Sequence, residues 1–314
     1  MKKIILLMLF LSSAFPLFAV LYPLTYLGAC ARTGDMDNDG DIDIIATDCI
    51  GNHSGFTVFY NDGFGNFDNS QWFGVSGISY GYIWIDCKDL NNDSYNDIVL
   101  LRSLGSTISK PIDIAYNNQD GTFGEFIEIQ TSLNHPGYIY FSNFFDDYYP
   151  EILVCGLTSA NSISVITHSV LNDMYYESML IDIPNGSKMM AIEYVLNENY
   201  PEIITMKYPG GNLMAGPSYN EYLGNYQFGS PVYQQTEDYY NNWIDVHDMN
   251  NDGLNDYLFV DIGHLYDPKK YFCWCENNGN GTFNMDCYVY EYQPWCGGFL
   301  VRDINNDFIH EIIV

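Results

Sequence analysis

A segment rich in aspartate and asparagine recurs along the chain at a nearly constant interval. The first copy runs from Asp35 to Asp43, and further copies begin at residues 89, 143, 194, 248 and 303. Successive copies start 51 to 55 residues apart. Such regularity predicts a repeat architecture, in which each copy is one supersecondary unit that packs on its neighbours.

Each repeat carries the pattern of four short strands. A strand rich in aromatic residues precedes the acidic segment, as at 82–85, and an apolar strand follows it, as at 98–101. A second pair of strands, such as 112–116 and 126–129, flanks a turn rich in Gly and Asn that ends in Phe123, which is typical of a hairpin. Four antiparallel strands in about 54 residues form the blade of a β-propeller. We therefore predict an all-β chain with about five full blades and a partial sixth in residues 20–314.

The last repeat is shorter than the others. It ends at Val314, within the strand that follows its acidic segment. We expect that the sequence is truncated, and the alternative is an unusual closure that uses residues 20–25.

Composition restricts the partners of such a propeller. The 314 residues are 47% apolar and 17% aromatic, and 40 Asp and Glu against 11 Lys and Arg give a formal charge of −29. A field of this sign repels polyanions, so nucleic acid, acidic polysaccharide and anionic membranes are disfavoured as partners.

The N-terminus predicts export. Residues 1–19 contain Lys2 and Lys3, then an apolar run and small residues, which is the pattern of a secretory signal peptide. The mature chain is expected to be secreted or at the cell surface, without a transmembrane span. A competing interpretation is a lipobox at residues 27–30, which would make Cys30 a lipidated first residue.

Eight cysteines in an exported chain predict disulfides. Cys30 and Cys49 lie almost symmetrically about the first acidic segment, so they are candidates for a bridge across a hairpin. Cys273 or Cys275 stands in the same relation to Cys287. The alternative is buried thiols.

The acidic segments fit a hard cation. Oxygen side chains at positions 1, 3, 5 and 9 of a tight loop can converge on Ca²⁺, which takes six to eight oxygen ligands. An EF-hand is excluded because position 12 lacks the bidentate Glu and because a strand follows the loop. The alternative is that Asp, Asn and Gly only make turns. The predicted ligands are Asp35, Asp37, Asp39, Asp41 and Asp43; Asp89, Asn91, Asp93 and Asp97; Asp248, Asn250, Asp252 and Asp256; and Asp303, Asn305, Asp307 and Glu311.

The two remaining copies have lost oxygens at positions 1 or 3, through Phe145, Tyr194 and Leu196. We expect them to keep the turn and to bind calcium weakly or not at all.

Together, the acidic loops and the turns ending in Phe resemble the FG-GAP and VCBS repeats of bacterial surface proteins, which are related in pattern to the calcium-binding blades of integrin α-subunits. The resemblance covers residues from about 25 to 314. It implies a calcium-stiffened propeller, usually a module for adhesion or ligand display. The chain departs from the family in lacking a Gly-Ala-Pro element after the loop and in its two eroded loops, so a shared partner is not implied.

No catalytic constellation is recognisable. The six histidines form no metal pair at helical spacing and lie in no nucleophile motif. We therefore expect a non-enzymatic protein of extracellular adhesion or recognition, with a protein or a neutral glycan as partner. The alternative is a lectin or a carbohydrate-active enzyme, either a lyase or a hydrolase, on the same scaffold. Candidate stacking residues, whose alternative role is packing between blades, are Trp72, Trp295, Tyr80, Tyr219, Tyr222, Tyr239 and Tyr240.

Overall fold

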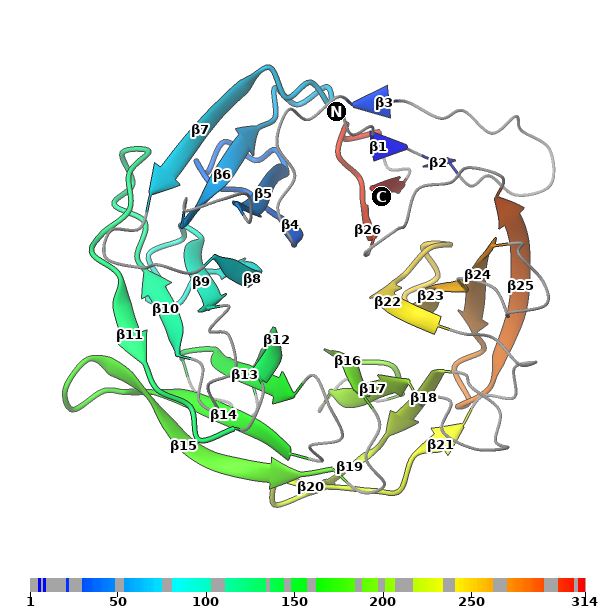
Figure 1. The fold of residues 1–314 in the computed structure, drawn as a ribbon. Coiled ribbons are helices and arrows are strands. Elements are labelled where there is room, and N and C mark those ends of the chain that lie inside the picture. Colours follow the sequence, from blue (N-terminus) through cyan, green and yellow to red (C-terminus); the bar gives the residue numbers. More distant parts are fainter. Residues whose placement is uncertain are drawn as a thin grey trace. The chain divides into compact units, whose positions relative to one another are not determined.

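The computed structural model of the chain describes seventeen stretches of sequence. They are residues 5–6, 8–9, 21–22, 30–48, 54–74, 81–102, 111–133, 136–143, 148–156, 162–183, 188–196, 201–206, 217–233, 241–261, 270–290, 299–307 and 310–313. All regular secondary structure within these stretches consists of β-strands, so the all-β class is confirmed (Figure 1).

Five antiparallel sheets of four strands follow one another along the chain, and in each the first three strands are paired in sequence order. Blade 1 consists of β4 (Ala31–Gly34), β5 (Asp43–Asp48), β6 (Gly55–Tyr60) and β7 (Asn69–Gly74). Blade 2 consists of β8 (Tyr82–Lys88), β9 (Asp97–Arg102), β10 (Ile112–Ala115) and β11 (Ile127–Ile129). Blade 3 consists of β12 (Pro136–Ser142), β13 (Glu151–Gly156), β14 (Ser162–Ser169) and β15 (Met174–Asp182). Blade 4 consists of β16 (Lys188–Glu193), β17 (Glu202–Met206), β18 (Pro217–Asn220) and β21 (Val232–Tyr233), with the small hairpin β19 (Tyr222–Gly224) and β20 (Gln227–Phe228) inserted. Blade 5 consists of β22 (Asn241–His247), β23 (Asp256–Asp261), β24 (Lys270–Asn277) and β25 (Phe283–Tyr290).

The ends of the chain form two smaller sheets. β26 (Leu300–Arg302) and β27 (Glu311–Ile313) are the first two strands of the sixth repeat, and β2 (Met8–Leu9) pairs with β27. β1 (Ile5–Leu6) pairs with β3 (Leu21–Tyr22). The prediction that residues 1–19 are a signal peptide remains a prediction.

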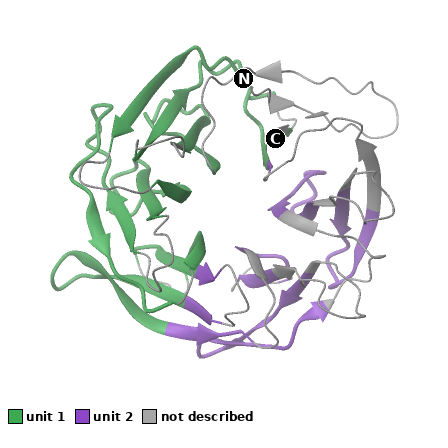
Figure 2. Cartoon of the chain, viewed as in Figure 1, with its two compact units in different colours: residues 1–154, 164–179, 300–314 green, residues 155–163, 180–299 purple. Residues whose placement is uncertain are grey.

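The chain divides into two compact units. Unit 1 comprises Met1–Val154, Ser164–Met179 and Leu300–Val314, and unit 2 comprises Cys155–Ile163 and Leu180–Phe299 (Figure 2). Blades 1 and 2 and the sheet of β26 and β27 therefore belong to unit 1, while blades 4 and 5 belong to unit 2.

Within unit 1, neighbouring blades interlock through aromatic rings. Phe56 on β6 is fully buried and stacks on Phe73 of the same blade at a ring distance of 5.1 Å. Phe123, which ends the blade 2 hairpin turn, meets both rings edge-on at 5.3 and 4.9 Å. The phenylalanine that closes this turn therefore packs on the preceding blade, and such ring pairs contribute about 0.5–1.5 kcal/mol beyond the burial of their area.

The sixth repeat packs on the first in the same way. Leu300 and Ile304 share a buried cluster with Ile44, Ala46 and Phe59 of blade 1. The apolar face that a blade cannot bury alone is thus covered by its neighbour.

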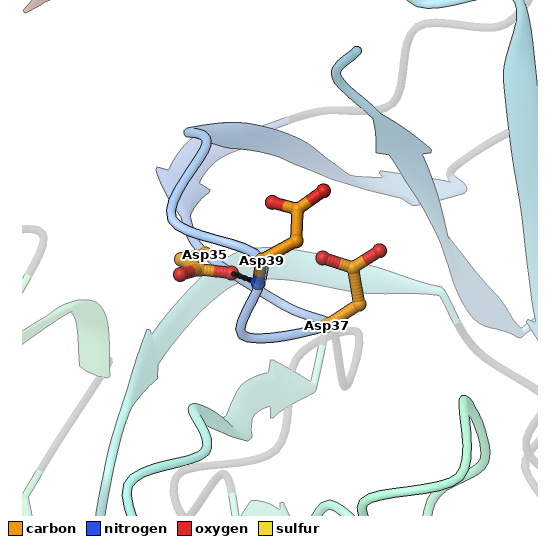
Figure 3. A group of neighbouring side chains, drawn as sticks. All are labelled: Asp35, Asp37 and Asp39. Atoms are coloured by element: carbon orange, nitrogen blue, oxygen red, sulfur yellow. Dashed lines mark hydrogen bonds between the residues drawn. The ribbon is translucent and has the colours of Figure 1, made fainter. Parts of the chain in front are cut away.

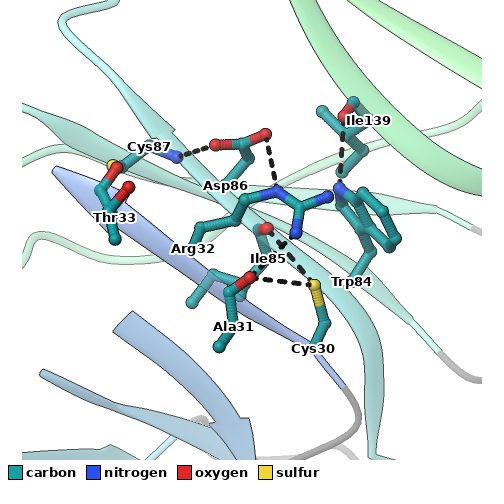
Figure 4. A network of polar contacts seen from close by, with 9 residues as sticks. All are labelled: Cys30, Ala31, Arg32, Thr33, Trp84, Ile85, Asp86, Cys87 and Ile139. Carbon is teal, nitrogen blue, oxygen red and sulfur yellow. Dashed lines mark hydrogen bonds and ion pairs between the residues drawn. The ribbon is translucent and has the colours of Figure 1, made fainter. Parts of the chain in front are cut away.

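The first strands of blades 1 and 2 are joined by a buried polar network (Figure 4). The Arg32 guanidinium lies 3.9 Å from the centroid of the Trp84 ring, and its Nε lies 3.5 Å from Asp86 Oδ2. The Trp84 indole N–H donates to the carbonyl of Ile139 in blade 3 at 3.1 Å. Because the Arg32 charge is both paired and stacked on an aromatic ring, it can be buried at 8% exposure.

The candidate bridge between Cys30 and Cys49 is wrong, because Cys30 is a free thiol. The Cys30 amide donates to Thr47 Oγ1 at 3.1 Å, and the Thr47 amide donates to the Cys30 carbonyl at 2.9 Å. Thr47 is thus the cross-strand neighbour of Cys30, while Cys49 lies outside the described residues. The Cys30 thiol is buried and donates to the Ile85 carbonyl at 3.9 Å.

In blade 5, the register of β24 and β25 places Cys273 opposite Cys287. Cys273 is disulfide-bonded, whereas Cys275 is a buried free thiol. Cys273 therefore forms a disulfide and Cys275 does not, while the pairing of Cys273 with Cys287 stays a prediction.

Candidate metal centre

The acidic segments lie between the first and second strands of their repeats. We name four of them loop 1 (35–43), loop 2 (89–97), loop 5 (248–256) and loop 6 (303–311), and the two eroded copies loop 3 (143–151) and loop 4 (194–202). Position 4 is an asparagine in the left-handed region in all four acidic loops, with φ between 57° and 61° at Asn38, Asn92, Asn251 and Asn306. Asparagine tolerates this conformation better than most residues, which explains its recurrence at this position.

Loop 1 brings three carboxylates together. Each of Asp35, Asp37 and Asp39 offers an oxygen within 4.8 Å of the others, and Figure 3 shows the side chains of Asp37 and Asp39 pointing the same way while Asp35 binds the Asp39 amide. Asp35 at position 1 also accepts the amides of Asp39 at 3.2 Å and Gly40 at 3.0 Å. The backbone of the loop therefore wraps around the first carboxylate and aligns the other two.

This grouping has an electrostatic cost. Asp37 is exposed, but partial desolvation within the loop raises its pKa, and the neighbouring charges of Asp39 and Asp35 raise it further. A divalent cation between these oxygens would replace their repulsion by attraction.

The other three loops replace the carboxylate at position 3 with an amide. In loop 2, Asn91 Nδ2 donates to Asp93 Oδ2 at 3.1 Å, and Asn91 Oδ1 accepts the Asp93 amide at 3.0 Å. Loops 5 and 6 repeat both bonds, at Asn250 with Asp252 and at Asn305 with Asp307. In these loops the carboxylate at position 5 has a partner on the same loop.

The carboxylates at position 9 occupy a different environment. Asp43 is 1% exposed, and its two oxygens accept the amides of Met36 and Asn61, both at 2.8 Å. Asp97 is fully buried and accepts the amides of Leu90 at 2.9 Å and Asn117 at 2.8 Å. These carboxylates tie each loop to the hairpin of its own blade.

Burial dominates the titration of these groups. It raises the pKa of Asp43 and of Asp97 to about 7, although the two amide bonds act in the opposite direction. Asp256 in loop 5 has the same two kinds of amide bond and also accepts the Trp274 indole N–H at 3.0 Å, and its pKa is raised by burial.

The eroded loop 4 distinguishes the candidate metal ligands at positions 1, 3 and 5 from the buried acid at position 9. Tyr194 and Leu196 replace the oxygens at positions 1 and 3. Glu202 at position 9 is nevertheless buried, and its Oε2 accepts the amides of Val195 at 2.9 Å and Leu196 at 3.0 Å. The acid at position 9 is therefore kept where the oxygens at positions 1 and 3 are lost, which indicates a structural role.

The donor set fits calcium better than a softer metal. Carboxylate, amide and backbone oxygens are the ligands of a hard cation, and the clustered side chains of loop 1 include no Cys or His.

Two further predicted ligands have other surroundings. In loop 6, Glu311 is fully buried, and its Oε1 has no hydrogen-bond partner among the described residues. Asp41, at position 7 of loop 1, accepts a hydrogen bond from Asn306 Nδ2 at 2.7 Å. One oxygen of this predicted ligand is therefore bonded to loop 6.

Sequence reasoning missed the asparagines that connect neighbouring loops. In blades 1, 2 and 5, the asparagine that opens the hairpin turn donates through Nδ2 to the position 2 carbonyl of the loop in the neighbouring repeat. The bonds run from Asn61 to Ile304 at 2.7 Å, from Asn117 to Met36 at 2.9 Å and from Asn277 to Val195 at 2.9 Å. The same residues donate their backbone amides to the position 9 carboxylates. Their recurrence at the same place in three of the repeats was the signal that could have revealed them.

Repeated four-stranded blades with an acidic loop after each first strand define a β-propeller of the repeat type. A family model described as an FG-GAP-like repeat matches residues 35–100, which extend from loop 1 into β9. The chain is thus a β-propeller, and the predicted resemblance to FG-GAP repeats is confirmed for residues 35–100.

Among solved structures, the chain is similar to a Bacteroides uniformis protein described as a putative 6-phosphogluconolactonase. The TM-score is 0.57 with 13% identity, and the match covers 96% of this chain and 87% of the other. At this identity the similarity shows the fold alone. No curated protein matches the chain.

Proposed function

We propose that the protein is an exported β-propeller that binds Ca²⁺ in its acidic loops and acts in extracellular adhesion or recognition without catalysis. The observation that carries the calcium proposal is the approach of three carboxylates within 4.8 Å in loop 1. Four loops of the same spacing support it, because Asp or Asn occupies positions 1, 3 and 5 in each.

The extracellular role rests on the signal-like residues 1–19 and on the family of the repeat. Among the described residues, no helix is long and apolar enough to span a bilayer. With a formal charge of −29, the chain is better suited to a protein or a neutral glycan than to an acidic polymer.

A calcium titration tests the metal proposal. The mature chain, stripped with EDTA, should bind about four ions per chain, with a rise in melting temperature of about 5 °C or more at saturating calcium. Asp39→Ala should lower the stoichiometry, while the control Asp62→Ala, in an exposed turn outside the acidic loops, should not. A chain that binds no calcium and melts at the same temperature with and without EDTA would remove the proposal.

A second candidate function is carbohydrate binding or processing. Trp72 on the edge strand β7 is 51% exposed, as a sugar-stacking ring would be. Tyr219 is 7% exposed and belongs to the blade interior, Tyr222 is half-buried, and the remaining stacking candidates lie outside the described residues.

Glycan-array binding by the calcium-loaded protein separates the two candidates. Binding of neutral glycans that is lost in Trp72→Ala would favour the lectin. Binding to cell-surface protein with an empty glycan array would favour adhesion.

A further inference from the structure

Side-chain amides connect loops 1 and 2 directly. Asn96, at position 8 of loop 2, donates through Nδ2 to the Asp35 carbonyl at 2.8 Å. Asp35 is at position 1 of loop 1, so its side chain is a candidate ligand while its backbone is the acceptor of this bond. Anything that fixes Asp35 therefore also fixes the side chain of Asn96.

A second connection passes through Asn117. Its Nδ2 donates to the Met36 carbonyl in loop 1, and its backbone amide donates to Asp97 in loop 2. Gln119 lies in the same turn and is not a candidate ligand. Its backbone amide donates to Asn117 Oδ1 at 3.0 Å, and its side-chain Nε2 donates to Asp93 Oδ2 at 3.0 Å. The hairpin turn of blade 2 thus contacts loop 1 and a candidate ligand of loop 2 at once.

Loops 6 and 1 are joined in the same manner. Asn61 Nδ2 donates to the Ile304 carbonyl of loop 6, and the Asn61 amide donates to Asp43 of loop 1. Asn306 of loop 6 returns a bond to Asp41 Oδ1. Three acidic loops of unit 1 are therefore connected in the order 6, 1, 2.

We propose that loops 6, 1 and 2 bind calcium cooperatively, because each bond holds one loop in the conformation that its neighbour requires. The proposal rests on the calcium binding proposed above and adds its regulation. Ordering a loop costs conformational entropy, so an ion in loop 1 pays part of the ordering cost of loop 2, and the second ion binds more tightly.

Unit 2 provides the matched control. Asn255, at position 8 of loop 5, donates through Nδ2 to the Tyr194 carbonyl of loop 4 at 2.9 Å. This bond is equivalent to that of Asn96, but loop 4 lacks oxygens at positions 1 and 3. Asn255 therefore connects loop 5 to a loop with no proposed ion.

Hydrogen exchange at increasing calcium concentrations measures the protection of each loop separately. In the wild-type mature chain, the peptides covering loops 1, 2 and 5 should gain protection with calcium, each with its own midpoint. Asp39→Ala should move the midpoint of loop 2 to higher calcium by about fivefold or more, although no candidate ligand of loop 2 has changed. By reciprocity, Asp93→Ala should move the midpoint of loop 1 by the same factor.

Two milder variants test whether the effect of Asp39→Ala on loop 2 reflects a general loss of folding. Asn96→Ala keeps every candidate ligand and should reduce the effect of Asp39→Ala on loop 2. Asn255→Ala removes the equivalent bond and should leave the midpoint of loop 5 within a factor of about two of the wild-type value.

The possible failures are distinct. Calcium-dependent protection of loop 2 with the same midpoint in wild type and Asp39→Ala overturns the coupling and leaves the calcium proposal intact. Absence of calcium-dependent protection in every loop of the wild type overturns both.

Discussion

Loops 1 and 2 have the same backbone but solve the same electrostatic problem differently. Loop 1 places carboxylates at positions 1, 3 and 5, and Asp37 has a raised pKa because of partial desolvation and its acidic neighbours. In loop 2, partial burial acts to raise the pKa of Asp93, but hydrogen bonds from Gln119, Tyr95 and Asn91 outweigh it and lower the pKa. Loop 2 is stabilised by amides of its own and of its hairpin, whereas loop 1 lacks the amide at position 3.

The comparison teaches that similar acidic loops need not depend equally on a cation. A loop whose charges are already hydrogen-bonded gains less stability from an ion than one whose charges repel each other. We therefore expect loop 1 to contribute more than loop 2 to any stabilisation by calcium.

The largest expected effect concerns what the loops share, the buried acid at position 9. Asp97→Ala leaves the amides of Leu90 and Asn117 without their acceptor, and each unpaired buried amide costs roughly 1–3 kcal/mol. Glu202→Ala in the eroded loop 4 should cost a similar amount. Urea unfolding in EDTA measures both free energies of unfolding, and a normal stability of Asp97→Ala without calcium would show that position 9 is not structural.

A smaller effect tests the difference at position 3 by exchanging it. Asp37→Asn gives loop 1 the amide of loop 2, and should raise the melting temperature in EDTA by about 1–2 °C because a repulsion is removed. The reverse change, Asn91→Asp, should lower it by a similar amount and should enlarge the calcium-dependent rise. Melting curves in EDTA and in calcium check both signs, and equal shifts in the same direction would contradict the comparison.

The smallest effect concerns the support that loop 2 receives from its hairpin. Gln119→Ala removes the exposed bond to Asp93 and should destabilise the metal-free protein by about 0.5 kcal/mol. In calcium the loss should become smaller if the ion replaces the amide as the partner of Asp93. A loss that is larger in calcium than in EDTA would mean that Gln119 acts on the loaded loop instead.

The repeat period was enough to predict the blades, because strands of four to eight residues separated by turn residues leave few alternatives at this spacing. The strands before and after the second acidic segment, β8 and β9, lie where the sequence places them, and the hairpin turn at residues 117–123 closes as expected. These features depend on local pattern, which a sequence shows directly.

Features that depend on cross-strand or interblade neighbours were not predictable. The mirror symmetry of Cys30 and Cys49 about loop 1 was misleading by two residues, because Ala31 pairs with Ala46 and so Thr47 follows opposite Cys30. Position 9 was grouped with the ligands because its residue type is the same, although Asp43 is buried and Asp37 is not. A linear spacing cannot distinguish a carboxylate that faces the solvent from one that faces the hairpin.

The asparagines that open the hairpin turns have a consequence for the exchange of parts between propellers. Asn117 recognises the backbone of a loop that lies one repeat earlier, so the sequence block that behaves as a module begins in one blade and ends in the next. A chimaera cut at the boundary between two sheets would separate donor from acceptor. A block that begins before the first strand of one blade and ends after the hairpin asparagine of the next, as from before β4 to after Asn117, would enclose both. Recombination or protein engineering that respects this offset should conserve the contact.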